Sequence, residues 1–297
     1  MFSGLSAFSL TPIYKNNVDK VAFASLIQRL VPSGVDSIGV LGSTGCYAYL
    51  SMKERAQAAR IAIEHAGNVP VIVGISATNT RDVLSLADDA QKAGARGVLL
   101  APVSYQKLTE DEVFSLYKTV TQQLSVPLCI YDNPLTTHFT FTDELHGRIA
   151  ELPNVGSIKI PAVSSDPIVA KARIEHLRNI IPSHVTIGIS GDACAASGLN
   201  AGCEAWYSVI GGLFPEIAMA ITQAAQASNA EEATRLSNCL KPLWNLFAEY
   251  GGSLRVIATA AELLGFVSSP SLPPPLMSIK GHGRQQLAEL LVELKLG

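Results

Sequence analysis

The sequence predicts an α/β fold, a (β/α)8 TIM barrel followed by a C-terminal helical appendage. Eight apolar or β-branched runs recur along residues 1–225, most of them roughly 26–34 residues apart, which is the length of one βα unit. The runs are almost continuously apolar, as in parallel strands buried on both faces. No GxGxxG opens a helix after the first run, so the barrel is favoured over a doubly wound open sheet.

The expected strands follow one another with short loops and amphipathic segments between them. The gap before the last strand is the shortest, so the helix within it must be brief. The eight strands are expected at Leu5–Leu10, Ser37–Leu41, Val71–Ile75, Gly97–Ala101, Pro127–Tyr131, Val155–Ile160, Val185–Ile189 and Glu204–Val209.

The segments between the strands carry start and stop signals for helices. Ser51–Glu54 and Thr109–Glu112 have the spacing of capping boxes. Gly34 and Gly94 stand where a helix should end before the next strand. The segment Asp82–Ala93 places apolar residues on one side and charged residues mostly on the other, as an amphipathic helix requires.

Strand signals stop after about residue 225. We therefore expect a catalytic barrel at 1–225 and a helical domain at 226–297 that packs on the barrel. Glycines 251 and 252 and the proline-rich stretch 270–275 interrupt this second part, since proline fixes φ and lacks a donor. The helices between these breaks are expected at Ala230–Tyr250, Ser253–Leu264 and Gly283–Leu296.

Composition excludes several classes of protein. The chain has 297 residues, of which 48% are hydrophobic and 16% charged, so a disordered chain is excluded. Its 22 Lys and Arg against 25 Asp and Glu give no electrostatic footprint for nucleic acid. No apolar run approaches the roughly 18 residues of a membrane helix. The N-terminus lacks the basic region of a secretory signal, so we expect a cytoplasmic protein.

Cysteine and histidine give no support for a metal centre. The five cysteines include no CxxC pair, and the six histidines form no HxxxH, HxH or HExxH. The cysteines are interpreted as buried small hydrophobes. We expect neither a metal nor a cofactor.

Lys159 is the most unusual residue of the sequence because it lies inside an apolar strand. A buried ammonium group is costly unless the lysine loses its proton or finds a partner. A free amine is the nucleophile that attacks a carbonyl to form a Schiff base. A lysine that reaches solvent or bridges a carboxylate from the strand end is the alternative.

Two further strand ends carry candidate groups. Tyr131 ends the fifth strand and would serve as a proton carrier, although a capping tyrosine with a bonded hydroxyl fits as well. Ser43 and Thr44 lie between glycines after the second strand, in a tight loop that suits a carboxylate or phosphate or an ordinary turn. The glycine-rich loops after the last two strands are interpreted as turns rather than phosphate sites.

Together these places resemble the dihydrodipicolinate synthase / N-acetylneuraminate lyase family. Gly42–Gly45 is similar to its GTTGE loop, and Tyr131–Pro134 resembles its YNxP motif. Ile158 and Lys159 resemble its Schiff-base strand, and the loops at Gly191 and Ser208 resemble its later loops. The order and spacing hold across residues 1–225, and the proline-rich helical tail is similar too.

The resemblance implies a pyruvate-dependent class I aldolase or lyase. Lys159 would form the imine with pyruvate or another 2-oxo acid, and Tyr131 would move protons. Ser43 and Thr44 would hold the pyruvyl carboxylate, with Thr44 also among the catalytic groups. Tyr105 is near the place of the family's second relay tyrosine, which crosses a dimer interface. A homotetramer and an aldehyde as the second partner are also implied.

The departures from the family pattern fall in the specificity region. Thr136 stands where dihydrodipicolinate synthases carry an arginine that binds the second substrate's carboxylate, so their activity is not expected here. Cys46 replaces the Glu of GTTGE, and Asp132 replaces the usual Asn. Glycines 211 and 212 stand where the family often has Ala-Asn. Thr136, Gly191 and Tyr207, which replaces an apolar residue near the lysine, are taken as substrate-binding positions.

Several functions stay open at this point. The first is an aldolase or lyase for a 2-oxo acid whose far end is not a simple carboxylate. A 2-keto-3-deoxy sugar acid fits because Asp132, Thr136 and Thr137 offer partners for sugar hydroxyls, and an aromatic hydratase-aldolase also fits. The others are a non-catalytic paralogue that binds a small acid, dihydrodipicolinate synthase proper, and a metal-dependent class II aldolase, which the missing His cluster disfavours.

Overall fold

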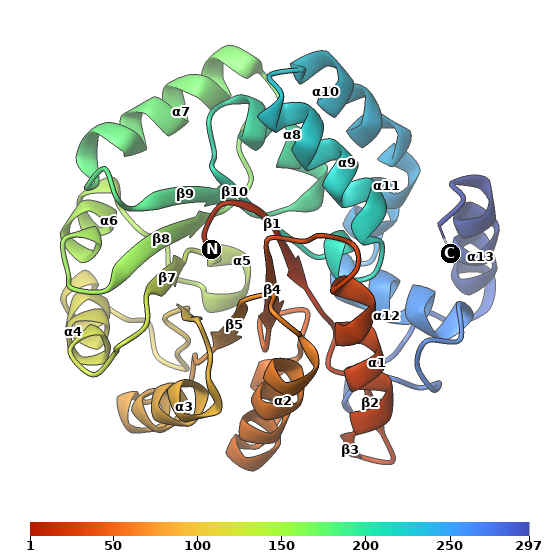
Figure 1. Ribbon diagram of the computed structural model, residues 1–297, viewed down its shortest axis with the longest axis horizontal. Coiled ribbons are helices and arrows are strands. Elements are labelled where there is room, and N and C mark those ends of the chain that lie inside the picture. The colour runs from red at the N-terminus through yellow and green to blue at the C-terminus, as the bar shows by residue number, and fades with distance from the viewer. Residues whose placement is uncertain (297) are drawn as a thin grey trace.

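The computed structural model describes residues 1–296, and its centre is a closed barrel of eight parallel strands (Figure 1). Each strand pairs with the strands before and after it, and β1 closes the ring by pairing with both β4 and β10. All eight expected strands are confirmed, with ends that differ by at most two residues. They are β1 (Gly4–Phe8), β4 (Ser37–Val40), β5 (Val71–Gly74), β6 (Gly97–Leu100), β7 (Leu128–Tyr131), β8 (Val155–Ile160), β9 (Thr186–Ile189) and β10 (Ala205–Ser208).

At least one helix follows each barrel strand, and eight longer helices cover the outside of the barrel. The capping boxes at Ser51 and Thr109 are both formed, and Gly94 ends its helix in the left-handed conformation. Gly34 is also left-handed but lies beyond the helix end at Val31, so its expected place as the cap is wrong. The helices are α1 (Lys20–Leu30), α2 (Met52–His65), α3 (Thr80–Ala93), α4 (Glu110–Thr121), α6 (Asp143–Ala150), α7 (Pro167–Ile180), α8 (Ala195–Asn200) and α9 (Pro215–Gln226).

Aromatic side chains fill much of the barrel interior. Phe8 and Tyr207 meet edge to face with ring centroids 6.0 Å apart. Glycines on neighbouring strands make room for them, since a Cβ at Gly39 would lie 2.4 Å from the Phe8 ring and one at Gly188 would lie 2.2 Å from Tyr207. Phe2 lies against the first residues of β6 and β8 and closes the N-terminal end of the barrel.

The C-terminal helices pack on one side of the barrel, as expected (Figure 1). Residues 230–250 form two helices rather than one, α10 (Ala230–Cys239) and α11 (Lys241–Glu249). Pro242 lies in the first turn of α11, where its missing N–H and fixed φ start a new helix instead of continuing the old one. The last two helices are α12 (Ser253–Leu263) and α13 (Gly281–Glu293).

A small hairpin before α1 was not expected from the sequence. Its strands are β2 (Ile13–Tyr14) and β3 (Asn17–Val18), joined through Lys15 and Asn16, which both have positive φ. Tight hairpin turns of this kind are usually marked by Asn-Gly or Asp-Gly. The Lys-Asn pair lacks that glycine, which left the turn without its strongest sequence signal.

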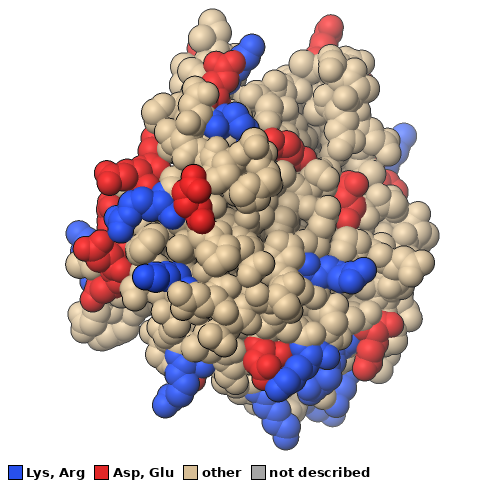
Figure 2. Space-filling model, turned by 60° about the vertical axis from the view of Figure 1, so that its left-hand side comes forward, with Lys and Arg blue, Asp and Glu red and all other residues tan. Residues whose placement is uncertain are grey.

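The surface carries charges of both signs. Figure 2 shows Lys and Arg interspersed with Asp and Glu over the face drawn. Several are paired, as in Lys92 with Asp88 and Arg148 with Asp111. Within residues 1–296, no helix has both the length and the apolar character needed to cross a bilayer. The division into units at 1–225 and 226–297 stays a prediction, and residue 297 lies outside the described residues.

Candidate active site

Lys159 projects from β8 into a buried aromatic cluster near the C-terminal end of the barrel. Its side chain is buried, with 4% of the residue exposed. The ammonium nitrogen lies 4.2 Å from the ring centroids of both Phe8 and Tyr131, and 5.6 Å from that of Tyr207. No carboxylate within residues 1–296 forms an ion pair with it. The sequence alternatives of a solvated lysine or a carboxylate bridge therefore do not describe this side chain.

Tyr131 lies beside Lys159 because the two residues are register partners on β7 and β8. Its hydroxyl accepts a hydrogen bond from Asn133 Nδ2 at 2.9 Å. The Ser43 hydroxyl lies 3.3 Å from the same oxygen, and Asn133 Nδ2 also donates to Ser43 Oγ at 3.4 Å. Three chain segments thus bring an amine, a phenol, a hydroxyl and an amide together.

Asn133 was not expected among the site residues. In the sequence it stands out only as part of the motif Tyr131–Pro134 at the end of the fifth strand. Residues two apart on an extended chain face the same side, so the alternation from Tyr131 to Asn133 was the signal that could have placed this amide in the site.

The loop after β4 is a tight turn, as expected, and it separates the two hydroxyls. Ser43 reaches Tyr131, whereas Thr44 is buried without a contact to that hydroxyl. Cys46 follows with positive φ, and its backbone N–H donates to the Ser43 carbonyl. Burial raises the pKa of the Cys46 thiol to about 12, so it stays protonated at neutral pH.

Tyr207 lies beneath the lysine rather than at the mouth of the barrel. Its hydroxyl is 2.6 Å from Ser157 Oγ and accepts from Cys129 Sγ at 3.4 Å. Ser157 and Cys129 lie two residues before Lys159 and Tyr131 on their strands, hence toward the N-terminal end of the barrel. With its hydroxyl bonded there, Tyr207 forms part of the floor of the site.

The remaining expected site residues lie outside the buried cluster. Thr136 is exposed on α5 (Pro134–Thr137), and its hydroxyl donates to the Asn133 carbonyl. Gly191 is exposed after β9 with a φ of 87°. Tyr105, between β6 and α4, is 95% exposed, so within one chain it contributes nothing to the cluster.

A buried carboxylate joins the two loops after β9 and β10. Asp192 accepts hydrogen bonds from the Trp206 indole, the Ser208 hydroxyl, and the backbone N–H groups of Val209 and Ile210. Burial raises the pKa of Asp192 to about 6, against the opposing effect of these hydrogen bonds. All of these donors belong to β10 and the loop that follows it, which indicates a structural role for the Asp192 carboxylate.

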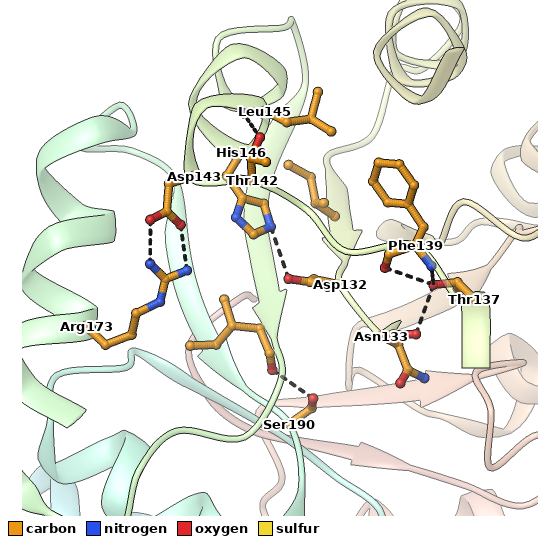
Figure 3. A network of polar contacts seen from close by, with 12 residues as sticks. Asp132, Asn133, Thr137, Phe139, Thr142, Asp143, Leu145, His146, Arg173 and Ser190 are labelled. Carbon is orange, nitrogen blue, oxygen red and sulfur yellow. Dashed lines mark hydrogen bonds and ion pairs between the residues drawn. The ribbon is translucent and has the colours of Figure 1, made fainter. Parts of the chain in front are cut away.

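Asp132 and Thr137 do not offer partners to a substrate, contrary to the sequence expectation. The Asp132 carboxyl points out of the barrel toward His146 on α6 (Figure 3). The buried Thr137 hydroxyl donates to the Asn133 carbonyl at 3.0 Å. Of the three polar side chains expected to bind sugar hydroxyls, only Thr136 is exposed.

The sequence matches a known protein family over nearly its whole length. A model of the dihydrodipicolinate synthetase family matches residues 1–294. The chain belongs to this family. Members of the dihydrodipicolinate synthetase family are class I, pyruvate-dependent lyases and aldolases, so the protein is a carbon–carbon lyase. Among residues 1–296, no three His, Cys, Asp or Glu side chains group in a way that could hold a metal ion.

Relatives within the family carry two kinds of name. The chain is 28% identical over 295 residues to the 4-hydroxy-tetrahydrodipicolinate synthase of Persephonella marina, with 98% of each chain covered. It is 43% identical to the dihydrodipicolinate synthase of Agrobacterium tumefaciens, whose crystal structure superposes with a TM-score of 0.94 over 99% of this chain and 98% of that one.

The second kind of name belongs to YagE of Escherichia coli, a putative 2-dehydro-3-deoxy-D-gluconate aldolase. YagE is 29% identical over 287 residues, which cover 94% of this chain and 92% of YagE. Its crystal structure in complex with pyruvate superposes with a TM-score of 0.90 over the full length of both chains. These relatives thus carry the names of two different activities within one family.

Proposed function

We propose that this chain cleaves or forms a 2-oxo acid through a Schiff base on Lys159, and that it is not a true dihydrodipicolinate synthase. The observation that carries the proposal is the buried Lys159 nitrogen 4.2 Å from the Tyr131 ring, with Ser43 and Asn133 on the Tyr131 hydroxyl. The unprotonated amine of a lysine is the nucleophile that attacks a carbonyl to form a Schiff base.

The chemistry follows from these groups. The neutral Lys159 nitrogen attacks the 2-oxo carbon, and the Tyr131 hydroxyl gives its proton to the departing oxygen, so that water leaves and a protonated imine forms. In the cleavage direction, the Tyr131 oxygen then takes the proton of the 4-hydroxyl group as the C3–C4 bond breaks, and the bonding electrons move into the imine to form an enamine. Tyr131 gives this proton to C3, and water adds to the imine carbon, which releases pyruvate and free Lys159 and returns one proton to Tyr131. Ser43 and Thr44 hold the pyruvyl carboxylate so that the reacting carbon stays against the lysine.

The second partner is proposed to be an aldehyde whose far end is not a simple carboxylate. Thr136 stands where an arginine would bind such a carboxylate, and a hydroxyl cannot replace a bidentate guanidinium. A 2-keto-3-deoxy sugar acid is the favoured substrate class, which the name of YagE supports. An aromatic hydratase-aldolase is the alternative within this mechanism.

Two other functions have specific support. The 43% identity to the Agrobacterium tumefaciens dihydrodipicolinate synthase favours that activity. The exposed Thr136 and the replacement of Glu by Cys46 favour a paralogue that binds pyruvate without turnover. A homotetramer, an aldehyde partner and a cytoplasmic location complete the proposal, with Tyr105 contributed across a subunit interface.

A substrate panel separates these functions. Pyruvate release from 2-keto-3-deoxy sugar acids is measured beside pyruvate consumption with aspartate semialdehyde and with aromatic aldehydes, using wild type, Lys159→Arg and the exposed control Lys92→Arg. The proposal predicts sugar-acid cleavage that only Lys159→Arg abolishes. Turnover of aspartate semialdehyde alone would establish a dihydrodipicolinate synthase, and no turnover of any pair would favour the paralogue.

A further inference from the structure

A carboxyl and an imidazole face each other in the buried layer between β7 and α6. Asp132 is 6% exposed and His146 is fully buried, with His146 Nε2 3.5 Å from Asp132 Oδ2 (Figure 3). Among residues 1–296, Asp132 Oδ1 and both ring nitrogens of His146 have no hydrogen-bond partner. Buried polar groups of this kind are costly unless they satisfy each other. At 3.5 Å the two groups lie at the edge of hydrogen-bond distance, and a proton placed between Nε2 and Oδ2 would satisfy both.

The neighbouring groups hold this pair in place without competing for it. The His146 ring stacks on Phe141 at 4.9 Å with an interplanar angle of 3°. Asp143, the nearest other carboxylate, is bound by both terminal nitrogens of Arg173 at 2.6 and 2.8 Å and lies 3.0 Å from His176.

The phenol of Tyr117 faces the pair from α4, and it donates its own hydrogen bond to the Leu100 carbonyl. The charged neighbours thus pair with one another, and this phenol bonds to a carbonyl. None of them forms a hydrogen bond with Asp132 or His146.

The pair is connected to the active site through the chain itself. Asp132 lies between Tyr131 and Asn133, whose side chains meet inside the barrel. Its backbone N–H donates to the Lys159 carbonyl at 3.0 Å. Because Asp132 points outward and its two chain neighbours inward, a shift of the Asp132 backbone would move both Tyr131 and Asn133.

We propose that Asp132 and His146 share one proton and act as positioning residues that hold Tyr131 and Asn133 beside Lys159. The positioning half rests on the proposed function of the site. The proton-sharing half stands on the geometry of the pair and is measured without any substrate.

Burial supports a reversed order of protonation in the folded chain. It raises the pKa of Asp132 from 3.8 to about 7 and lowers the pKa of His146 from 6.5 to about 4. In the folded protein the proton therefore resides on Asp132, whereas in the unfolded chain it resides on His146. Between about pH 4 and 6.5 both states bind one proton at this pair, so the pair adds no pH dependence to the free energy of unfolding in that window.

Single substitutions should each reveal one of two opposite dependences of the melting temperature on pH. In His146→Leu, Asp132 keeps its raised pKa, so the melting temperature relative to wild type falls as pH rises from about 4 to 7. In Asp132→Asn, His146 keeps its lowered pKa, so the relative melting temperature falls as pH drops from 6.5 to about 4. The double variant should show neither slope. Parallel slopes in the two single variants would overturn the shared proton.

A measurement on the wild type covers the case in which a variant does not fold. In NMR of histidine-labelled protein, His146 should stay neutral down to about pH 4. Loss of its signal in His146→Gln assigns the resonance, and His184→Gln is the exposed control. Titration of His146 near 6.5, the value for an ordinary imidazole, would contradict the pair.

The positioning role is tested by turnover together with trapping of the pyruvate imine. In folded His146→Leu, kcat should fall about tenfold or more while the KM for the 2-oxo acid stays within about twofold, because the reacting groups are displaced rather than removed. His146→Gln should recover part of kcat, since its amide can still bond Asp132. Unchanged kcat in His146→Leu would rule out positioning. Absence of a pyruvate adduct in wild type would refute the proposed function instead and leave the titration results standing.

Discussion

At the residue scale, the Tyr131 hydroxyl is the junction of the site. It lies on the strand beside Lys159 and is approached by Ser43 from the β4 loop and by Asn133 from its own loop. A hydrogen bond donated to this oxygen strengthens as negative charge develops on it. In the proposed mechanism, Asn133 therefore acts with the reacting groups and is not only part of the turn that follows the strand.

Replacing Asn133 by leucine removes this donor at similar size. Because hydrogen bonds to charged groups contribute about 1.5–3 kcal/mol, kcat should fall about 10- to 100-fold. Steady-state kinetics with the best substrate of the panel measures this, and Asn238→Leu on the surface of α10 is the matched control. Equal kcat in the two variants would remove Asn133 from the catalytic groups.

Some of these residues could be predicted from the sequence and others could not, for physical reasons. Lys159 was found because a charge within an apolar strand is costly in any fold. His146 lies on the buried face of α6, where a single histidine looks like an ordinary core residue. Its partner Asp132 belongs to another element, and only the packing of α6 against β7 brings the two side chains together.

At the element scale, one buried carboxylate anchors the C-terminal helices. Glu262 on α12 accepts hydrogen bonds from the hydroxyls of Ser269, Ser271 and Ser278, and from Arg284 on α13. Burial alone would raise its pKa, but these hydrogen bonds lower it overall. The proline-rich stretch that the sequence marked as a break is thus held in place by the helix before it and the helix after it.

Glu262→Gln should destabilise the fold by about 2–3 kcal/mol, because the neutral amide cannot accept from all these donors and leaves buried groups unpaired. Thermal unfolding at pH 7 measures the loss, with Glu289→Gln on the exposed side of α13 as the control. The difference from wild type should shrink as pH falls below 4.5, because the unfolded chain then binds a proton that folded Glu262, with its lowered pKa, takes up only at a lower pH. Equal melting temperatures for both variants would contradict the anchoring role.

The elements themselves were largely predictable. Continuous apolar runs marked every barrel strand, because parallel strands buried on both faces tolerate little else. The split between α10 and α11 was missed because Pro242, which starts α11, lies inside one continuous amphipathic pattern. The two strands of the β2–β3 hairpin have only two residues each, which is too few to show an alternating pattern in the sequence.

At the scale of the whole molecule, the exposed Tyr105 suggests that one chain does not complete the site. Its ring has almost no contact with its own chain, while the buried cluster around Lys159 is formed without it. Large aromatic side chains left in solvent commonly mark protein interfaces. A second copy that covers Tyr105 would explain the exposure.

Light scattering of the purified protein should accordingly give four times the mass of one chain. Tyr105→Phe should keep that mass and lower kcat, because it removes only the hydroxyl of the proposed relay. Tyr14→Phe, on the exposed β2, is the control. A monomer with full activity, or an unchanged kcat in assembled Tyr105→Phe, would contradict this contribution from a second chain.

The central claim is that Lys159 forms the imine, and reduction of that imine tests it most directly. Wild type, Lys159→Arg and Lys92→Arg are incubated with pyruvate and borohydride, then digested and mapped by mass spectrometry. A reduced pyruvate adduct is expected on the peptide that contains Lys159 in wild type and Lys92→Arg, with none in Lys159→Arg. An unmodified Lys159 in folded wild-type protein, or an adduct on another lysine, would contradict the account.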